Sequence, residues 1–279
     1  MKSEWNVISP KRRFFDINIR EYWQYRDLYF IYIKRDLIAA YKQTILGPLW
    51  YIIQPLITMA FYMFLFGDLA KIPTDGIPQP IFYFSGIMLW NYFSASFSYS
   101  SDIFTSNVSV FSKVYFPRLI IPLSALTSNL VKLGIQVLFF ILIYIWFVLQ
   151  GYSFNISWTL ALFPFLIIIL AMYSLSWGLI ISCITYKYRD LRQLVNYGIQ
   201  LFMYITPVVY PLNATPSAFK IFIELNPITP VFEIFRYSVT GCGNISWWTL
   251  AYSYGLLFIT LVISVSLFNK TEKTFMDTV

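Results

Sequence analysis

The stretch that decides the fold is residues 133–186, LGIQVLFFILIYIWFVLQGYSFNISWTLALFPFLIIILAMYSLSWGLIISCITY, which holds no charged side chain over 54 positions. A membrane-spanning helix needs about 20 apolar residues, so this run is too long for a single crossing. Its middle is interrupted by turn-prone residues, namely Gln150, Gly151, Ser153, Asn155 and Ser157. The run therefore predicts two spanning helices joined by a turn.

Four further uncharged runs lie outside this stretch, at residues 43–67, 76–101, 193–219 and 237–269. Over the whole chain 58% of residues are hydrophobic and 12% are charged, against about 45–50% and about 25% in soluble domains. We expect an all-α membrane protein with a lead-in (1–45), a six-span domain (46–269) and a tail (270–279). The spans are expected at about 46–66, 80–100, 122–149, 158–185, 194–211 and 247–268.

The distribution of basic residues predicts the orientation of the chain. Sixteen of the 20 Lys and Arg residues fall on the side of the two termini and three fall on the opposite side. Short cytoplasmic loops concentrate Lys and Arg, so both termini are expected in the cytoplasm. This asymmetry accounts for the net charge of +7 without nucleic acid as a partner. The remaining residue, Lys132, is expected near the inner interface, where its side chain can reach toward water.

Three segments outside the spans carry apolar patterns. Residues 21–41 mix aromatic and charged side chains without Gly or Pro and predict an interfacial helix on the inner leaflet, with a plain charged anchor as the alternative. The loop 101–118 places Phe104, Val108 and Phe111 at helical spacing. It either docks on a soluble partner as a short helix or rests on the headgroups.

The external segment 211–248 contains two apolar stretches, 218–225 and 230–240, that are too short to span a bilayer. Segments of that length beside a membrane predict re-entrant or interfacial helices. Glu233 and Arg236 are three residues apart, so they are expected to pair on one helical face.

The residues needed for catalysis are missing from the sequence. The chain contains no histidine, and its two cysteines, Cys183 and Cys242, are expected on opposite sides of the membrane. No carboxylate falls within the six expected spans, so a membrane-embedded transferase lacks its acid or base. A phosphate-binding G-x-x-x-x-G-K-[ST] loop is also missing from the sequence. We therefore expect a transport subunit with no catalytic, metal or cofactor site of its own.

Six motifs occur in order along nearly the whole chain. They are Tyr41-Lys42-Gln43-Thr44-Ile45-Leu46-Gly47-Pro48-Leu49-Trp50 with Gln54-Pro55-Leu56, Ser85-Gly86 with Leu89-Trp90-Asn91-Tyr92-Phe93, Phe116-Pro117-Arg118, Tyr188-Arg189-Asp190-Leu191, Thr206-Pro207-Val208-Val209-Tyr210-Pro211, and Asn226-Pro227-Ile228-Thr229-Pro230. Together with Lys34-Arg35-Asp36-Leu37, this succession resembles the permeases of ATP-binding-cassette systems of the second type that export O-antigens, capsular polysaccharides and teichoic acids.

The resemblance implies a homodimer in the inner membrane that works with two copies of a cytoplasmic ATPase, which binds ATP and Mg. It implies a pore for a lipid-linked glycan between the two permeases. The residues implied in coupling to the ATPase are Arg35, Asp36, Lys42, Phe104, Val108, Phe111 and Arg118. Those implied in an outer gate are Pro227, Pro230, Glu233 and Arg236.

The pore wall is expected where hydroxyl, amide and aromatic side chains share one helical face, because a sugar polymer needs hydrogen bonds and flat apolar surfaces. The residues of this expected pathway are Tyr51, Gln54, Thr58, Tyr62, Trp90, Tyr197, Gln200 and Tyr204. Helix packing through interhelical hydrogen bonds is the alternative explanation of the same pattern. A drug or small-lipid exporter on the same scaffold is the rival function, and it would need a more apolar cavity.

Overall fold

The computed structural model describes residues 19–42, 44–107, 111, 116–188, 190–243 and 245–278. These residues form helices joined by turns and short irregular segments, and they include no strand. The predicted all-α fold is therefore confirmed. Val108 and Arg189 lie outside the described residues.

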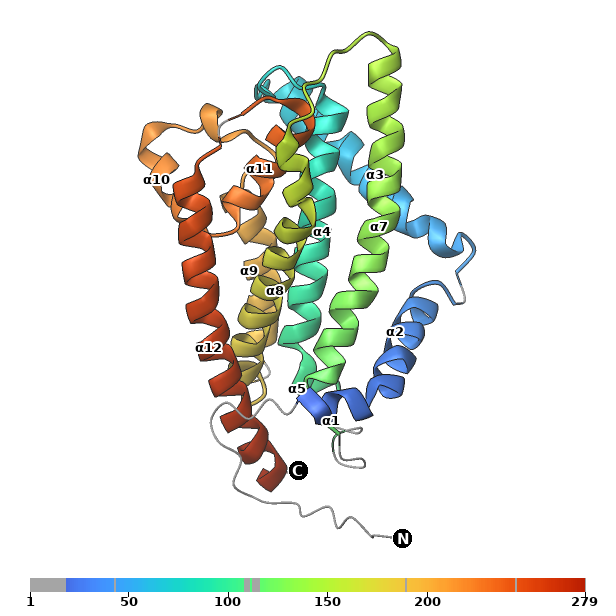
Figure 1. The fold of residues 1–279 in the computed structure, drawn as a ribbon, viewed down its shortest axis with the longest axis vertical. Helices are drawn as coiled ribbons and strands as arrows, with labels where there is room; N and C mark the ends of the chain where they lie inside the picture. Colours follow the sequence, from blue (N-terminus) through green and yellow to red (C-terminus); the bar gives the residue numbers. More distant parts are fainter. Residues whose placement is uncertain are drawn as a thin grey trace.

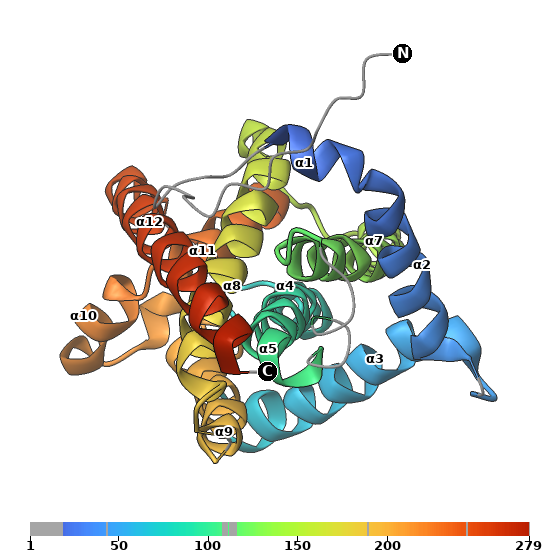
Figure 2. The same cartoon turned by 90° about the horizontal axis from the view of Figure 1, so that it is seen from below.

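The centre of the molecule is helix α4 (Gln79–Ser101). The helices that pack against it include α3 (Trp50–Tyr62), α7 (Ile120–Leu149), α8 (Phe163–Thr185), α9 (Leu191–Ile205) and α11 (Thr229–Thr240) (Figure 2). Large side chains of α4 such as Tyr83, Phe84 and Phe93 are completely buried. Helix α8 approaches α4 closely where Gly178 of α8 meets the small side chain of Ser100 on α4. A Cβ added to Gly178 would lie 2.4 Å from Ser100 Cβ, so only glycine fits there.

Four helical stretches of the described chain are long and apolar enough to cross a membrane: Gly47–Leu69, Ile120–Leu149, Trp158–Thr185 and Trp247–Glu272. They match four of the six predicted spans. Helix α4 does not reach the same hydropathy because Ser and Asn side chains interrupt its apolar surface. Helix α9 has 15 residues and is about 22 Å long, shorter than a hydrocarbon core of about 30 Å. The spans at 80–100 and 194–211 thus stay predictions.

Helix α9 ends at Ile205, six residues before the predicted end of the span at 211. Thr206 has extended backbone angles, φ −94° and ψ 141°. A residue before proline avoids the helical region, and Pro207 itself has no N–H to continue the helix. The sequence Thr206-Pro207 therefore sets the end of α9.

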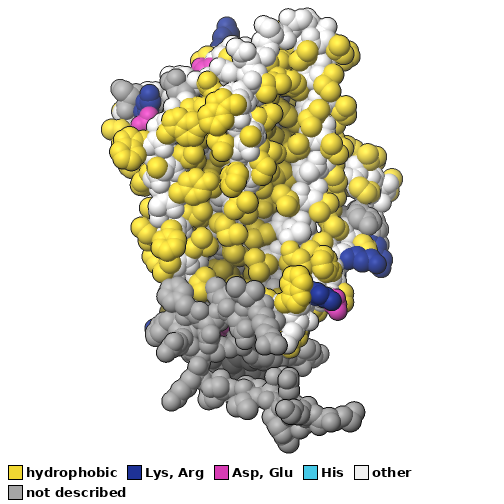
Figure 3. Space-filling view, viewed as in Figure 1, with side chains coloured by type: hydrophobic (Ala, Val, Ile, Leu, Met, Phe, Trp, Pro, Cys, Tyr) yellow, Lys and Arg dark blue, Asp and Glu magenta, His cyan; other side chains and the backbone are white. Residues whose placement is uncertain are grey.

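The sides of the bundle are covered by hydrophobic side chains, while charged side chains in this view gather toward its upper and lower ends (Figure 3). Large apolar residues such as Leu138, Trp146 and Phe258 are more than half exposed. A soluble protein rarely exposes so continuous an apolar surface. This surface is the one expected of a protein surrounded by lipid.

The lead-in forms helix α1 (Ile19–Gln24) and helix α2 (Arg26–Tyr41), which confirms the predicted helix in this region. Helix α2 lies along the lower half of α7 (Figure 1). Its Tyr32 is buried, and Ser128 of α7 donates a hydrogen bond to the Ile33 carbonyl at 3.5 Å. The lead-in is therefore packed on the bundle.

Short helices complete the two ends of the bundle. The chain enters α3 through the 3-10 turn η1 (Gly47–Leu49) and leaves it through a π-helix, η2 (Met63–Leu69), while η3 (Trp158–Leu162) precedes α8. Helix α5 (Ile103–Ser106) follows α4 at the lower end. At the upper end lie η4 (Leu212–Ala214), α10 (Ser217–Leu225) and α11 (Thr229–Thr240) (Figure 1).

The last helix is longer than expected. Helix α12 (Trp247–Thr278) packs against α8 and continues through most of the segment 270–279 that was predicted as a separate tail. Its buried Phe268 stacks on Phe104 of α5, with ring centroids 5.1 Å apart. This contact joins the C-terminal helix to the segment that follows α4.

Candidate functional site

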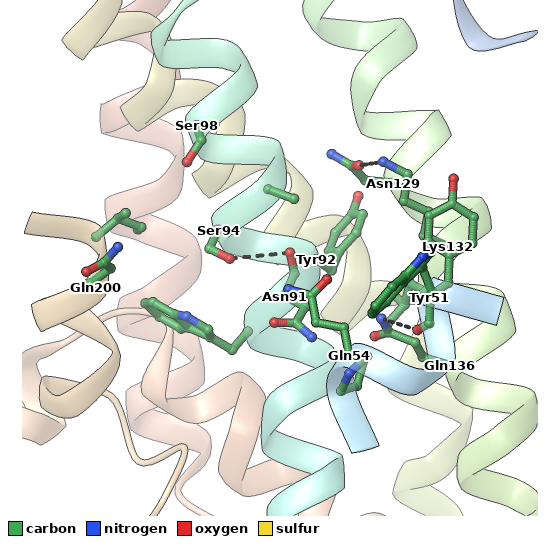
Figure 4. A pocket seen from close by; sticks show the side chains of 16 residues that line it. Tyr51, Gln54, Asn91, Tyr92, Ser94, Ser98, Asn129, Lys132, Gln136 and Gln200 are labelled. Carbon is green, nitrogen blue, oxygen red and sulfur yellow. Dashed lines mark hydrogen bonds between the residues drawn. The ribbon is translucent and has the colours of Figure 1, made fainter. Parts of the chain in front are cut away.

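A cavity of about 440 Å³ opens between α3, α4, α7 and α9. Its walls combine aromatic rings with amide, hydroxyl and ammonium groups (Figure 4). The lining residues are Trp50, Tyr51, Gln54, Pro55, Trp90, Asn91, Tyr92, Ser94, Ala95, Ser98, Asn129, Lys132, Leu133, Gln136, Ile199 and Gln200. Such a wall is suited to an elongated polar ligand that also offers flat apolar faces.

Polar side chains reach this cavity because three helices each carry them along one face. In a helix, residues at i, i+3 and i+7 lie one above another. Two complete sets line the cavity, Asn91, Ser94 and Ser98 on α4 and Asn129, Lys132 and Gln136 on α7. On α3 the first two members of the predicted set, Tyr51 and Gln54, also line it.

Hydrogen bonds fix one side of the cavity. Gln136 Nε2 on α7 donates to the Tyr51 carbonyl on α3 at 3.2 Å, and Asn129 Nδ2 donates to Ser96 Oγ on α4 at 3.2 Å. Lys132 Nζ donates to Asn129 Oδ1 at 3.0 Å (Figure 4). These bonds hold α3 and α4 to α7.

Other amide groups in the wall are uncommitted. Within the described part of the chain, the side chains of Gln54, Asn91 and Gln200 form no hydrogen bond with another residue. Both glutamines are exposed and Asn91 is partly exposed. The cavity therefore offers free amide donors and acceptors to a ligand.

Half of the predicted pathway residues meet in this cavity: Tyr51, Gln54, Trp90 and Gln200. The hydroxyl of Thr58 instead donates back to the Gln54 carbonyl at 3.0 Å, and the Tyr62 hydroxyl points to Met203 Sδ of α9 at 3.4 Å. These two residues do not line the cavity, and only the Tyr62 contact is an interhelical hydrogen bond of the kind that the packing alternative expects.

The remaining two pathway residues lie elsewhere on α9. Tyr204 lines a second, largely apolar cavity of about 830 Å³ at the upper end of the bundle, between α9, α10 and the segment after η2. Tyr197 is 65% exposed and lines neither of these two cavities. The single stripe predicted on α9 thus divides between different surroundings.

Sequence reasoning found Trp90 on α4 but missed the polar residues that α4 and α7 contribute to the cavity. Asn91, Ser94 and Ser98 repeat at i, i+3 and i+7, as do Asn129, Lys132 and Gln136. The same spacing argument that selected residues of α3 and α9 would have found them.

The lower end of the bundle contains a second group of predicted residues. Phe104 and Phe111 are 1% and 4% exposed and pack with Phe116 and Phe268. These two side chains therefore face the interior of this chain and offer no free docking face. If Phe104 and Phe111 act in coupling to a partner, they do so by holding this segment in its conformation and not by contacting the partner.

Two arginines fix the segment after α4 to other helices. Arg118 is 3% exposed, donates to the Glu272 carbonyl at 3.3 Å and lies 3.6 Å from the Glu272 carboxylate of α12. Arg192 at the start of α9 donates to the Asp102 carboxylate, which directly follows α4, at 2.6 Å. The end of α4 is therefore joined to the start of α9, and the start of α7 is joined to α12.

The predicted coupling residues of α2 have mixed positions. Arg35 donates to Asp36 Oδ1 at 2.8 Å and to the Tyr99 hydroxyl of α4 at 3.1 Å. Burial acts on the Arg35 guanidinium, yet its hydrogen bond and attraction to Asp36 raise the pKa of Arg35 overall. Lys42 is exposed. Arg35 thus holds α2 to the bundle, and Lys42 remains open to solvent or a partner.

A buried arginine joins several elements at the upper end of the bundle. Arg236 donates to the Pro207 and Val208 carbonyls, both at 2.6 Å, and its guanidinium lies 3.9 Å from the centre of the Phe82 ring. Its Nη1 lies 3.7 Å from Glu233 Oε1, which confirms the predicted pairing of these two residues. Arg236 thereby joins α11 to α4 and to the segment after α9.

Burial shifts the ionisation of this pair in opposite directions. Desolvation raises the pKa of Glu233 above its ordinary value, although the charge of Arg236 partly offsets this rise. Desolvation lowers the pKa of Arg236 to about 10, again partly offset by Glu233. Arg236 is still charged near neutral pH, so the upper end of the bundle contains a buried charge.

The predicted outer-gate residues belong to well-packed structure. Eleven of the twelve residues of α11 are buried, Pro230 among them. The Pro227 carbonyl accepts a hydrogen bond from Ser253 Oγ of α12 at 2.6 Å. Helix α10, in contrast, exposes Phe219, Ile221 and Phe222. A moving part at this end is therefore more compatible with α10 than with α11.

The sequence of this chain is similar to those of known membrane transport proteins. A profile of the ABC-2 type transporter family matches residues 27–240. The O-antigen export system permease protein RfbA of Klebsiella pneumoniae is 29% identical over 254 residues, which cover 90% of this chain and 94% of that protein. The protein of the same name from Myxococcus xanthus is 28% identical, with 78% and 82% covered.

A more distant relative is named for a different polymer. The polysialic acid transport protein KpsM of Escherichia coli is 22% identical over 240 residues, which cover 86% of this chain and 91% of that protein. The family profile extends from α2 to the end of α11 and so includes the cavity and both of its ends. The chain belongs to the ABC-2 type transporter family.

Proposed function

We propose that this chain is the membrane subunit of an ATP-driven exporter that moves a lipid-linked polysaccharide, similar to an O-antigen, from the cytoplasm to the outer face of the inner membrane. The observation that carries the proposal is the cavity between α3, α4, α7 and α9, where rings and uncommitted amides line one wall. Rings stack on the flat faces of sugars, and amides pair with their hydroxyls. The relatives named for O-antigen export and polysialic acid transport support the same substrate class.

The proposed assembly has two copies of this chain and two copies of a separate ATPase that binds ATP and Mg. Each permease crosses the membrane six times, with α4 and α9 as the second and fifth spans and both termini in the cytoplasm. α2 lies on the inner surface, and α10 and α11 lie at the outer mouth. The apolar sides of the bundle and the basic residues at its lower end support this orientation.

Capsular polysaccharide or teichoic acid export is the alternative within the same class, and the relative KpsM favours it. A drug or small-lipid exporter fits less well, because the cavity wall includes five amide side chains and a lysine.

Deleting the gene tests the proposal. Lipid-linked glycan is expected to accumulate inside the cell and to reach the surface again when the wild-type chain is restored. Normal surface glycan in the deletion strain would contradict it.

The cavity wall is expected to be reached by water. In a background with Cys183 and Cys242 replaced by Ser, cysteine at Gln54 or Gln200 should react with a membrane-impermeant thiol reagent. Thiols react as thiolates, which form in water but not in lipid. The matched control is Leu138→Cys on the exposed apolar face of α7, which should react at least tenfold more slowly. Equal rates at the three positions would show that this wall is no aqueous path.

The ion pair between Asp102 and Arg192 is expected to carry coupling between α4 and α9. Arg192→Asp should reduce ATP-driven export severalfold, and Asp102→Arg combined with Arg192→Asp should restore it. Because the pair is partly exposed, the stability change should stay within about 1 kcal/mol. Export by the reconstituted complex is the measurement, with Lys220→Asp on α10 as the control. A double variant no better than the single one would remove this pair from the mechanism.

A further inference from the structure

Lys132 is a cation in the cavity wall whose charge has no direct counterpart. Its Nζ donates to Asn129 Oδ1 at 3.0 Å and lies 5.7 Å from the centre of the Tyr51 ring (Figure 4). Among the described residues no carboxylate lies within 4.0 Å of this ammonium. An ammonium has three donor hydrogens, and one is used here. Two donors are therefore available to a ligand in the cavity.

The nearest acidic influence on Lys132 comes from Asp36 of α2. Asp36 attracts the ammonium electrostatically from beyond ion-pair distance. Its Oδ1 is committed to Arg35, which donates to it twice, at 3.0 and 2.8 Å. Asp36 thus attracts Lys132 without occupying its donors.

The position of Lys132 along α7 places it near the inner surface of the membrane. Ser128, one turn closer to the cytoplasmic end, contacts the backbone of α2, and α2 carries exposed charged side chains such as Lys34. The Lys132 side chain also bends back toward Asn129, in the direction of that end. A lysine placed here reaches the depth at which lipid headgroups lie.

We infer that the cavity binds an anionic oxygen group of the substrate through Lys132. This inference rests on the proposed function. The Lys132 ammonium keeps two donors unused, and phosphate or carboxylate oxygens complete its shell. The uncommitted amides of Gln54 and Asn91 add donors in the same wall. Lys132 is therefore a binding residue that selects acidic over neutral ligands.

Two parts of a lipid-linked glycan can supply such a group. One is a phosphate that joins the glycan to its lipid, and the other is an acidic sugar in the polymer itself. Both present anionic oxygens to the ammonium. Ligands that carry only one of the two separate them.

The test measures binding to the full-length chain in lipid nanodiscs. Farnesyl diphosphate is compared with farnesol, and hexagalacturonate is compared with the neutral maltohexaose. The wild type should bind at least one of the charged ligands more tightly than its neutral match. Lys132→Gln should weaken that binding about tenfold or more, as expected for the loss of a charge-assisted hydrogen bond. Lys132→Arg should stay within about threefold of the wild type, because the cation is kept.

Lys187→Gln is the matched control, because Lys187 is an exposed cation on the same side of the membrane that does not line the cavity. It should leave both affinities unchanged. Thermal unfolding of Lys132→Gln checks that the variant is folded. If it is not, weakening of wild-type binding by salt together with retention in Lys132→Arg supports the inference, and salt-independent binding overturns it.

Loss confined to farnesyl diphosphate assigns the anion to the lipid linkage, and loss confined to hexagalacturonate assigns it to the polymer. Equal affinity of wild type and folded Lys132→Gln for both charged ligands overturns the inference.

Failure of this inference can be distinguished from failure of the proposed function. A Lys132→Gln variant that binds and exports as the wild type does overturns the inference alone. Lysine-dependent anion binding in a chain that never exports polysaccharide overturns the function alone.

Discussion

Replacing Arg236 with Met should lower the free energy of unfolding by about 3–5 kcal/mol. The side chain is 5% exposed and supplies the donors for the Pro207 and Val208 carbonyls. Its loss leaves these acceptors without their donors and leaves the buried Glu233 carboxylate without its nearest cation. Denaturation of the purified chain in mixed micelles measures the difference. The matched change Lys220→Met breaks an exposed i,i+4 pair with Glu224 and should cost less than about 0.5 kcal/mol.

The loss of stability caused by Arg236→Met should depend on pH. Burial already raises the pKa of Glu233 in the folded state, and Arg236 opposes that rise, so the variant raises it further. A carboxyl whose folded pKa exceeds its unfolded pKa stabilises the protein at low pH, and this stabilisation is lost as pH rises through the folded pKa. The difference from wild type should therefore be smaller at pH 5 than at pH 8. Glu233→Gln in the Arg236→Met background should recover part of the loss, and no recovery would show that the carboxylate is not the source of strain.

Local sequence patterns predicted the helices because helix formation in lipid depends on local rules. Uncharged runs gave the four stretches that are apolar enough to span, and Pro207 explains why α9 ends before residue 211. The spacing of Glu233 and Arg236 predicted their pairing, since i,i+3 neighbours meet on any helix. The contacts of Arg236 with Phe82 and with the Pro207 carbonyl could not be predicted, because they depend on how α11 packs against α4.

The candidate site shows the same division between local and long-range information. Spacing placed Tyr51 and Gln54 on one face, and both line the cavity. It could not show that Thr58 would bond to the Gln54 carbonyl, or that Tyr62 would meet Met203 of α9. Nor could it show that Phe104 is covered by Phe268, which is more than 150 residues away in sequence. The sequence pattern of an apolar loop is the same whether the loop packs against another protein or against its own chain.

Gly178→Ala should destabilise the chain although the new group is a single methyl. The Cβ would lie 2.4 Å from Ser100 Cβ and 2.9 Å from the Phe97 carbonyl oxygen of α4. Real Cβ contacts are not this short, and the backbone of α4 cannot yield as a flexible side chain can. Adding volume to a packed interior costs about 1–3 kcal/mol, so α8 must move away from the central helix.

Gly134→Ala is the matched control, because Gly134 lies within helix α7 and a Cβ there would meet nothing within 4 Å. Alanine is the better helix former, so this change should stabilise the chain by roughly 0.5–1 kcal/mol. Unfolding of both variants in the same micelles gives the comparison, with export measured alongside. Since α4 forms one wall of the cavity, displacement of α8 should also reduce export by Gly178→Ala. If Gly178→Ala were as stable as Gly134→Ala, the close crossing of α4 and α8 would not contribute to holding the central helix in place.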